Sequence, residues 1–104
     1  MNRAWSAACY SDANTRSERE WRDLALAHAA VAVDHARQAT NCHCTVIVND
    51  CRLSQLSPLG RDKFGDILVH EVYLALGDRC VYCAADCYVS DPGFIRVRIT
   101  LMRG

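Results

Sequence analysis

Cysteine is the residue type in this sequence with the greatest capacity for chemistry. Seven of the 104 residues are cysteines. Such a set can bind a metal ion, perform redox chemistry or fill small positions in a core. The strongest candidate for a site combines Cys42-x-Cys44 with Cys80-x-x-Cys83, because zinc takes four ligands in a tetrahedron and thiolates are common among them. The full set is Cys9, Cys42, Cys44, Cys51, Cys80, Cys83 and Cys87.

The spacing of the cysteines nevertheless favours core packing. Val81 and Tyr82 separate Cys80 from Cys83, without a glycine or proline to form a tight knuckle. In an extended strand, residues three apart point to opposite faces, so we expect Cys80 and Cys83 to diverge. In each of the two segments, the cysteines fall on the same face of the predicted strand as alanine or valine residues. A small apolar side chain belongs at such positions. We therefore predict no metal site and no cofactor, and keep a cysteine-ligated zinc protein as an alternative.

The histidines and acidic residues form no recognisable catalytic motif. His70 and Glu71 are adjacent, but the second histidine of a metalloprotease helix is absent four residues further on. His28 and His35 share one face of a predicted helix, where histidines are more often core or interface residues than ligands. The sequence contains no glycine-rich phosphate loop and no nucleophile elbow. We therefore predict no catalytic residues and no enzyme activity.

Composition points to one small globular domain. Hydrophobic residues make up 51% of the chain and charged residues 23%, with twelve basic and twelve acidic side chains. A net charge of zero disfavours binding to nucleic acid or to a membrane surface, because both usually require a basic excess. No segment has the roughly 18 apolar residues that span a bilayer, and the first ten residues lack the layout of a signal peptide. We expect a cytoplasmic protein.

Two amphipathic helices and an intervening strand are predicted in the first three quarters of the chain. Ser17 and Glu20 form a capping box that starts a helix ending near Ala39. A β-branched run from Cys42 to about Asn49 predicts a strand, and residues 51–60 predict a loop. A second helix spans roughly 61–76 and ends at Gly77. The predicted inner face of the first helix is Trp21, Leu24, Ala25, His28, Val31, Ala32 and His35; that of the second is Phe64, Ile67, Leu68, Val72 and Leu76.

A β-hairpin is predicted at the C-terminal end. Two β-rich segments flank Asp91-Pro92-Gly93, and the second alternates apolar and polar residues from 95 to 101. A two-residue loop would pair Cys87 with Arg98, whereas a three-residue loop would pair Cys87 with Val97 and gather the apolar residues on one face. We favour the second register, because a slip of one residue would turn a whole strand inside out.

The order of elements predicts an α+β fold. Two helices pack on one face of a three- or four-stranded antiparallel or mixed sheet, in the order (β)-α-β-α-β-β. Residues 1–16 are predicted to form an N-terminal arm or edge strand, and residues 17–104 a single α+β domain.

Apolar side chains outside the predicted inner faces suggest a function. Leu26, Ala29 and Val33 fall on the outer side of the first helix, and Val69 and Tyr73 on the outer side of the second. A surface helix should be polar there, so a second macromolecule is expected to cover these residues, although a few exposed apolar side chains are ordinary.

The exposed face of the sheet offers a second cluster, formed by Tyr82, Tyr88, Arg96 and Arg98. Tyrosine and arginine are enriched at protein interfaces, and the same side chains could stack on and neutralise single-stranded nucleic acid. Cross-strand packing between the two residue types is the simpler structural explanation.

We therefore predict a small non-catalytic protein-interaction module. It would act as a regulator or inhibitor that masks a partner protein, and would form a homodimer. A nucleic-acid-binding module that uses the Tyr/Arg face is the main alternative. The predicted partner-binding residues are Arg22, Leu26, Ala29, Val33, Arg37, Val69, Tyr73, Tyr82, Tyr88, Arg96 and Arg98.

Overall fold

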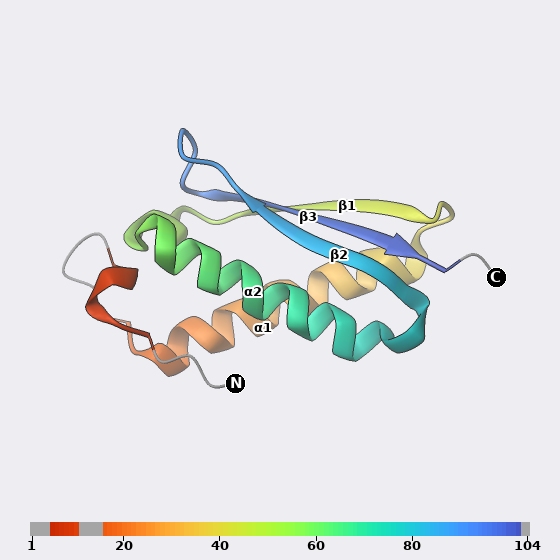
Figure 1. Cartoon of the computed structure of the whole chain (residues 1–104), viewed down its shortest axis with the longest axis horizontal. Helices are drawn as coiled ribbons and strands as arrows, with labels where there is room; N and C mark the ends of the chain where they lie inside the picture. The colour runs from red at the N-terminus through yellow and green to blue at the C-terminus, as the bar shows by residue number, and fades with distance from the viewer. Residues whose placement is uncertain (1–4, 11–15, 103–104) are drawn as a thin grey trace.

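Two helices cover one face of a three-stranded antiparallel sheet in the computed structural model of the chain, which describes residues 5–10 and 16–102 (Figure 1). The strand order is β1-β3-β2, so β3 is central and the sheet has two free edges. This confirms the predicted α+β class, with three strands rather than four among the described residues. The elements are α1 (Glu18–Gln38), β1 (His43–Asn49), α2 (Pro58–Leu76), β2 (Cys80–Cys87) and β3 (Phe94–Leu101).

The described part of the predicted N-terminal arm or edge strand, residues 5–10, contains a short 3₁₀ helix, Ala7–Cys9, and a single antiparallel bridge from Tyr10 to Leu56. Residues 1–4 and 11–15 of that prediction lie outside the described residues. Trp5 stacks on the fully buried ring of Trp21, with centroids 6.5 Å apart, and so fixes the arm to the start of α1. The carbonyl oxygen of Cys9 accepts a hydrogen bond from the Ser57 N–H at 2.9 Å, which fixes the arm to α2 as well.

α1 begins at the predicted capping box, but its buried face differs from the prediction. Leu24 and His28 are only partly buried, and Val31 and His35 are exposed. The prediction gave weight to large side chains, whereas the helix buries a row of alanines whose small size lets α2 pack closely against it. The placement of Ala29 and Val33 on an outer face is therefore wrong. The buried residues of α1 are Trp21, Ala25, Ala29, Ala32, Val33 and Ala36.

α2 begins at Pro58, a few residues before the predicted start. Ser57 is the N-cap, and its hydroxyl accepts a hydrogen bond from the Gly60 N–H, while proline at the first helical position needs no N–H partner. The segment predicted as a loop therefore contains the first turn of α2 and a 3₁₀ helix, Cys51–Gln55. The predicted inner face is confirmed: Ile67 is half-buried, and Phe64, Leu68, Val72 and Leu76 are buried.

The hairpin of β2 and β3 has the predicted faces but not the predicted register. Cys87 lies opposite Ile95, not opposite Val97 as the three-residue loop required. The connection is longer because residues 88–93 fold into a bend and a turn, where the Phe94 N–H bonds the Asp91 carbonyl oxygen. A shift of two residues keeps each side chain on its face, so the apolar row of β3 still points towards the helices.

A β-bulge at the start of β2 changes the arrangement of two cysteines. Cys80 lies opposite Leu101 and Tyr82 lies opposite Thr100, which leaves Val81 as an extra residue. Cys80 and Cys83 are therefore both buried, at 7% and 6% exposure. The prediction that these two side chains diverge is wrong, because it assumed a regular strand.

Within residues 5–10 and 16–102, no helix combines the length and the apolar character needed to cross a membrane.

Candidate functional site

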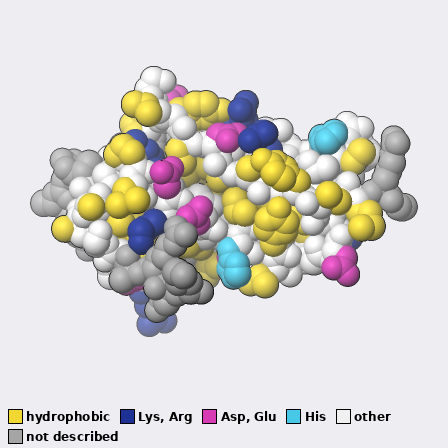
Figure 2. All heavy atoms as spheres, in the orientation of Figure 1, with side chains coloured by type: hydrophobic (Ala, Val, Ile, Leu, Met, Phe, Trp, Pro, Cys, Tyr) yellow, Lys and Arg dark blue, Asp and Glu magenta, His cyan; other side chains and the backbone are white. Residues whose placement is uncertain are grey.

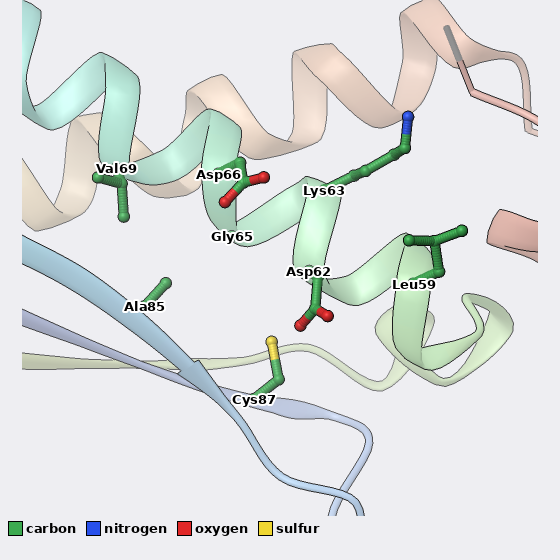
Figure 3. Close-up of a pocket in the computed structure, with 8 residues that line it drawn as sticks. All are labelled: Leu59, Asp62, Lys63, Gly65, Asp66, Val69, Ala85 and Cys87. Atoms are coloured by element: carbon green, nitrogen blue, oxygen red, sulfur yellow. The ribbon is translucent and has the colours of Figure 1, made fainter. Parts of the chain in front are cut away.

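A groove of about 380 Å³ lies between α2 and the free edge of β2 (Figure 3). α2 forms one wall and the second half of β2 the other. The wall from α2 carries both apolar and acidic side chains, and β2 contributes two small ones. The lining residues are Leu59, Asp62, Lys63, Gly65, Asp66, Val69, Ala85 and Cys87.

Two small residues set the depth of this groove. A Cβ atom at Gly65 would lie 3.1 Å from the Cβ of Ala85, so glycine allows α2 to approach β2 closely at this level. Larger residues along α2 then form the rim, and among them Leu59 is 47% exposed. The groove is thus a consequence of close packing at one point between two otherwise bulky elements.

The backbone of β2 is directed into the groove at alternate residues. The Cys83 N–H donates to the Tyr73 Oη at 2.8 Å, and therefore points away from β3 and towards α2. Backbone direction alternates along an antiparallel strand, so the N–H and C=O groups of Ala85 and Cys87 point the same way. Within the described part of the chain, no hydrogen bond to those two backbone groups is present. They remain able to pair with an added strand.

The thiols beside the groove are protonated at neutral pH. Burial, and then the charge of Asp62, raises the pKa of Cys87 to about 11, and its Sγ donates to the Arg61 carbonyl oxygen at 3.6 Å. Burial raises the pKa of Cys83 to about 12. The thiolate is the nucleophilic and metal-binding form of cysteine, so these side chains contribute packing rather than reactivity. Figure 3 shows Cys87 and Asp62 pointing towards each other across the groove.

The surface above α2 and β2 is apolar at its centre. Figure 2 shows apolar side chains gathered over the middle of this face, with acidic side chains to one side of them. Tyr73 is 37% exposed and Tyr82 is 46% exposed. Of the predicted partner-binding residues, only Val69 lines the groove. Tyr73 lies one turn further along α2, where its hydroxyl accepts from the Cys83 N–H, and Tyr82 lies on the outer face of the sheet.

The four predicted residues of the Tyr/Arg cluster do come together on the outer face of the sheet. The guanidinium of Arg96 lies 5.8 Å from the ring centre of Tyr88, and that of Arg98 lies 5.9 Å from the ring centre of Tyr82. Cross-strand cation–π packing is therefore present, as the simpler explanation required.

Asp86 lies at the centre of this cluster and was missed. Its carboxylate accepts two hydrogen bonds from Arg98, at 2.7 and 3.2 Å, and one from Arg96 at 3.4 Å. These contacts, chiefly the one to Arg98, hold the pKa of Asp86 below its ordinary value. The carboxylate neutralises one of the two positive charges, which reduces what the face could offer to phosphate groups. Asp86 lies four residues after Tyr82, so strand alternation alone could have placed it on this face.

The predicted residues on α1 do not form a site. Arg22 pairs with Glu18 at 3.1 Å, and Arg37 donates to the Ala75 carbonyl oxygen of α2 at 3.3 Å. Leu26 is exposed, but Ala29 and Val33, which should have extended its surface, are buried in the core. What remains is one apolar side chain between two arginines that have partners within the chain.

A polar cluster ties α1 to the end of β1. The Asp50 side chain is only 6% exposed, and its Oδ2 lies 2.9 Å from the His28 Nε2 and 2.7 Å from the Arg52 Nη2. Its Oδ1 accepts from the Arg52 backbone N–H at 3.0 Å and from the Arg52 Nε at 2.9 Å. Both oxygens are therefore used in positioning the loop after β1.

Among residues 5–10 and 16–102, no group of three or more His, Cys, Asp or Glu side chains is arranged to hold a metal ion. All seven cysteines are free thiols.

The features of this chain that could bind a partner are the groove, the sheet edges and the surface clusters. Comparison with known proteins finds no match among family models, curated proteins or solved structures.

Proposed function

We propose that this chain is a small non-catalytic protein-interaction module that binds an extended segment of a partner protein in the groove between α2 and β2. The observation that carries the proposal is the free edge of β2, whose backbone groups at Ala85 and Cys87 face a groove of about 380 Å³. An extended segment that adds to a sheet edge gains backbone hydrogen bonds, and neighbouring pockets select its alternate side chains.

The walls of the groove define the chemistry of the segment. Leu59 and Val69 offer apolar surface at the two ends, and between them Asp62, Lys63 and Asp66 give an excess of one negative charge. A segment with alternating apolar side chains and one or more basic residues complements these walls in shape and charge. By binding such a segment, the module would mask it from other partners of the same protein, and would thereby act as a regulator or inhibitor.

Two further features support this assignment. The raised pKa values of Cys83 and Cys87 leave both thiols protonated, which suits a binding role better than a chemical one. Seven unpaired thiols suit a reducing compartment, so we assign the module to the cytoplasm as part of the same proposal.

Selection from a random peptide library displayed on phage tests the proposal. Peptides enriched by the wild-type chain should alternate apolar residues and carry Lys or Arg, and their affinity should be measured by fluorescence anisotropy. Binding should shift the amide resonances of Ala85 and Cys87 in NMR spectra, because their N–H groups would donate hydrogen bonds to the added strand.

A pair of matched variants locates the site. Val69→Lys should weaken peptide binding about tenfold or more, because it places a positive charge on an apolar wall of a groove that takes basic segments. Leu26→Lys makes the same change of charge on α1, at a residue 42% exposed and outside the groove, and should bind like wild type. Failure to enrich any peptide, or loss of binding in Leu26→Lys but not in Val69→Lys, would overturn the proposal.

A further inference from the structure

Within residues 5–10 and 16–102, the free edge of β1, at the opposite side of the sheet, is a second row of backbone groups without a partner strand. The Leu101 N–H donates to the Cys42 carbonyl oxygen at 2.7 Å, which identifies the residues of β1 that bond β3 as those with even numbers. The other residues direct their N–H and C=O groups away from the sheet. Those residues are His43, Thr45, Ile47 and Asn49.

β1 lacks the devices that normally protect a free edge. In natural proteins, charged side chains, proline, bulges or a covering element protect edge strands from pairing with another chain. The β2 edge has a bulge at Cys80/Tyr82, and the hydroxyl of Tyr73 takes one of its N–H groups. β1 has the sequence HCTVIVN, pairs with β3 without a register shift, and carries no Asp, Glu, Lys, Arg, Pro or Gly. Its exposed side chains include Ile47, at 50% exposure.

We infer that two copies of this chain pair through β1, antiparallel about a two-fold axis at Val46, to form one continuous six-stranded sheet. The order of strands would be β2-β3-β1, followed by the same three strands of the second copy in reverse. The occupant is a second copy because the strand is complementary to itself in this register, as the residue pairs show.

The register about Val46 uses the whole strand. His43 faces Asn49 of the second copy, and Thr45 faces Ile47 of the second copy, with the reciprocal pairs on the other side of the axis. Each of these four pairs joins two residues whose backbone N–H and C=O groups point away from β3. Each pair can exchange two backbone hydrogen bonds, which gives about eight in total. None of the pairs opposes like charges, and each Ile47 gains an apolar contact with the methyl group of a threonine.

The side of α1 nearest this edge also exposes an apolar side chain. Arg37 marks the flank of α1 that faces α2, because its guanidinium reaches the Ala75 carbonyl oxygen. His28 marks the other flank, because it meets Asp50 at the end of β1. Val31 follows His28 by three residues, so it shares that flank, and it is 52% exposed. A two-fold axis through β1 brings this flank of each α1 towards its counterpart, which would cover Val31.

Mass measurement with a matched pair of double variants tests the inference. Multi-angle light scattering at tens of micromolar, with reductant present to exclude disulfide-linked dimers, should give twice the monomer mass of 11.6 kDa. Thr45→Glu/Ile47→Glu should weaken dimerisation at least about tenfold, because each new Glu would directly oppose one from the second copy. Within one chain these positions lie opposite Arg98 and Arg96, so the fold should tolerate the change.

The control variant Val81→Glu/Val89→Glu adds the same charge at two exposed residues away from β1, and should remain dimeric. Circular dichroism verifies that both variants are folded. Should the β1 variant unfold, hydrogen exchange on the wild type decides: the amides of Thr45 and Ile47 should become protected as protein concentration rises.

Three results overturn the inference. They are a monomeric wild-type mass at 100 micromolar, a β1 variant that is folded and still dimeric, and a mass that grows with concentration without reaching a limit. The last result would indicate head-to-tail pairing of β1 with β2. The first two results leave the proposed function intact, because neither concerns the groove, whereas the third would make β1 of another copy the segment that occupies the β2 edge.

Discussion

Removal of the Asp50 carboxylate is the substitution whose effect the structure allows us to work out most fully. In Asp50→Ala, the Arg52 backbone N–H loses its capping acceptor, which costs about 1 kcal/mol. The partly buried His28 loses a hydrogen bond of similar value. The Arg52 side chain is 45% exposed, so its ion pair adds at most a few tenths of a kcal/mol after solvent screening. The sum is about 2–3 kcal/mol.

A loss of this size is a large fraction of the free energy of unfolding expected for such a domain, about 5–15 kcal/mol. It should lower Tm by about 10 °C or more, since 1 kcal/mol corresponds to roughly 4–8 °C in a domain of this size. Thermal and urea unfolding, followed by circular dichroism, measure both quantities. Asp34→Ala is the matched control, because Asp34 is exposed on α1, and it should change the free energy of unfolding by less than about 0.5 kcal/mol.

The pH dependence of the same variant provides an independent check. Hydrogen bonds from Arg52, and then from His28, hold the pKa of Asp50 well below its ordinary value. A folded-state pKa below the unfolded value of about 3.9 gives a contribution that is complete above about pH 5 and is lost as pH falls towards the folded value. The stability difference between wild type and Asp50→Ala should therefore narrow from pH 5 to pH 2. A difference as small as that of Asp34→Ala, or one that widens in acid, would refute the role given to the cluster.

Three further substitutions or treatments probe the elements around the groove. Tyr73→Phe should cost about 0.5–1 kcal/mol and speed hydrogen exchange at the Cys83 amide, whose acceptor it removes. Unchanged exchange would show that the bond is not formed in solution. Gly60→Ala should destabilise by about 1–3 kcal/mol in urea titrations, because the new Cβ would overlap the Cys9 carbonyl oxygen; a neutral effect would place the N-terminal arm elsewhere. A maleimide at pH 7 should label exposed Cys51 long before buried Cys83, as followed by peptide mass spectrometry, and equal rates would contradict the burial that raises the pKa of Cys83 to about 12.

The elements and their faces could largely be predicted from local patterns. The alternation from Ile95 to Leu101 identified which face of β3 is buried, and this prediction survived a hairpin register that was wrong by two residues. The capping box at Ser17 located the start of α1, because that signal depends only on residues within one turn. The length of the hairpin loop could not be predicted from the Pro92-Gly93 pair, because residues 88–93 are held partly by a contact to Asp50 from another part of the chain.

Long-range packing explains why the face of α1 and the groove were not predicted. Alanine is compatible with both the surface and the interior of a protein, so the row of four alanines gave no sign that α2 would pack on it. The groove likewise depends on the distance between Gly65 and Ala85, which belong to elements separated in sequence. The Tyr/Arg cluster was predicted because strand alternation alone places its members on one face.

The two free edges of the sheet connect the two proposals. β1 and β2 lie on opposite sides of β3, so a dimer formed through β1 leaves the groove beside each β2 open. In the six-stranded sheet, five spacings of about 4.8 Å would separate the two β2 strands by about 24 Å. A two-fold axis perpendicular to the sheet would keep the helices of both copies on the same face, so both grooves would be accessible from one side. A partner with two suitable segments could then engage both grooves at once, with an avidity that a monomer cannot reach. The unprotected edge of β1 would thus serve assembly. The edge of β2, which is protected at its start by the bulge and Tyr73 but open at Ala85 and Cys87, would serve recognition.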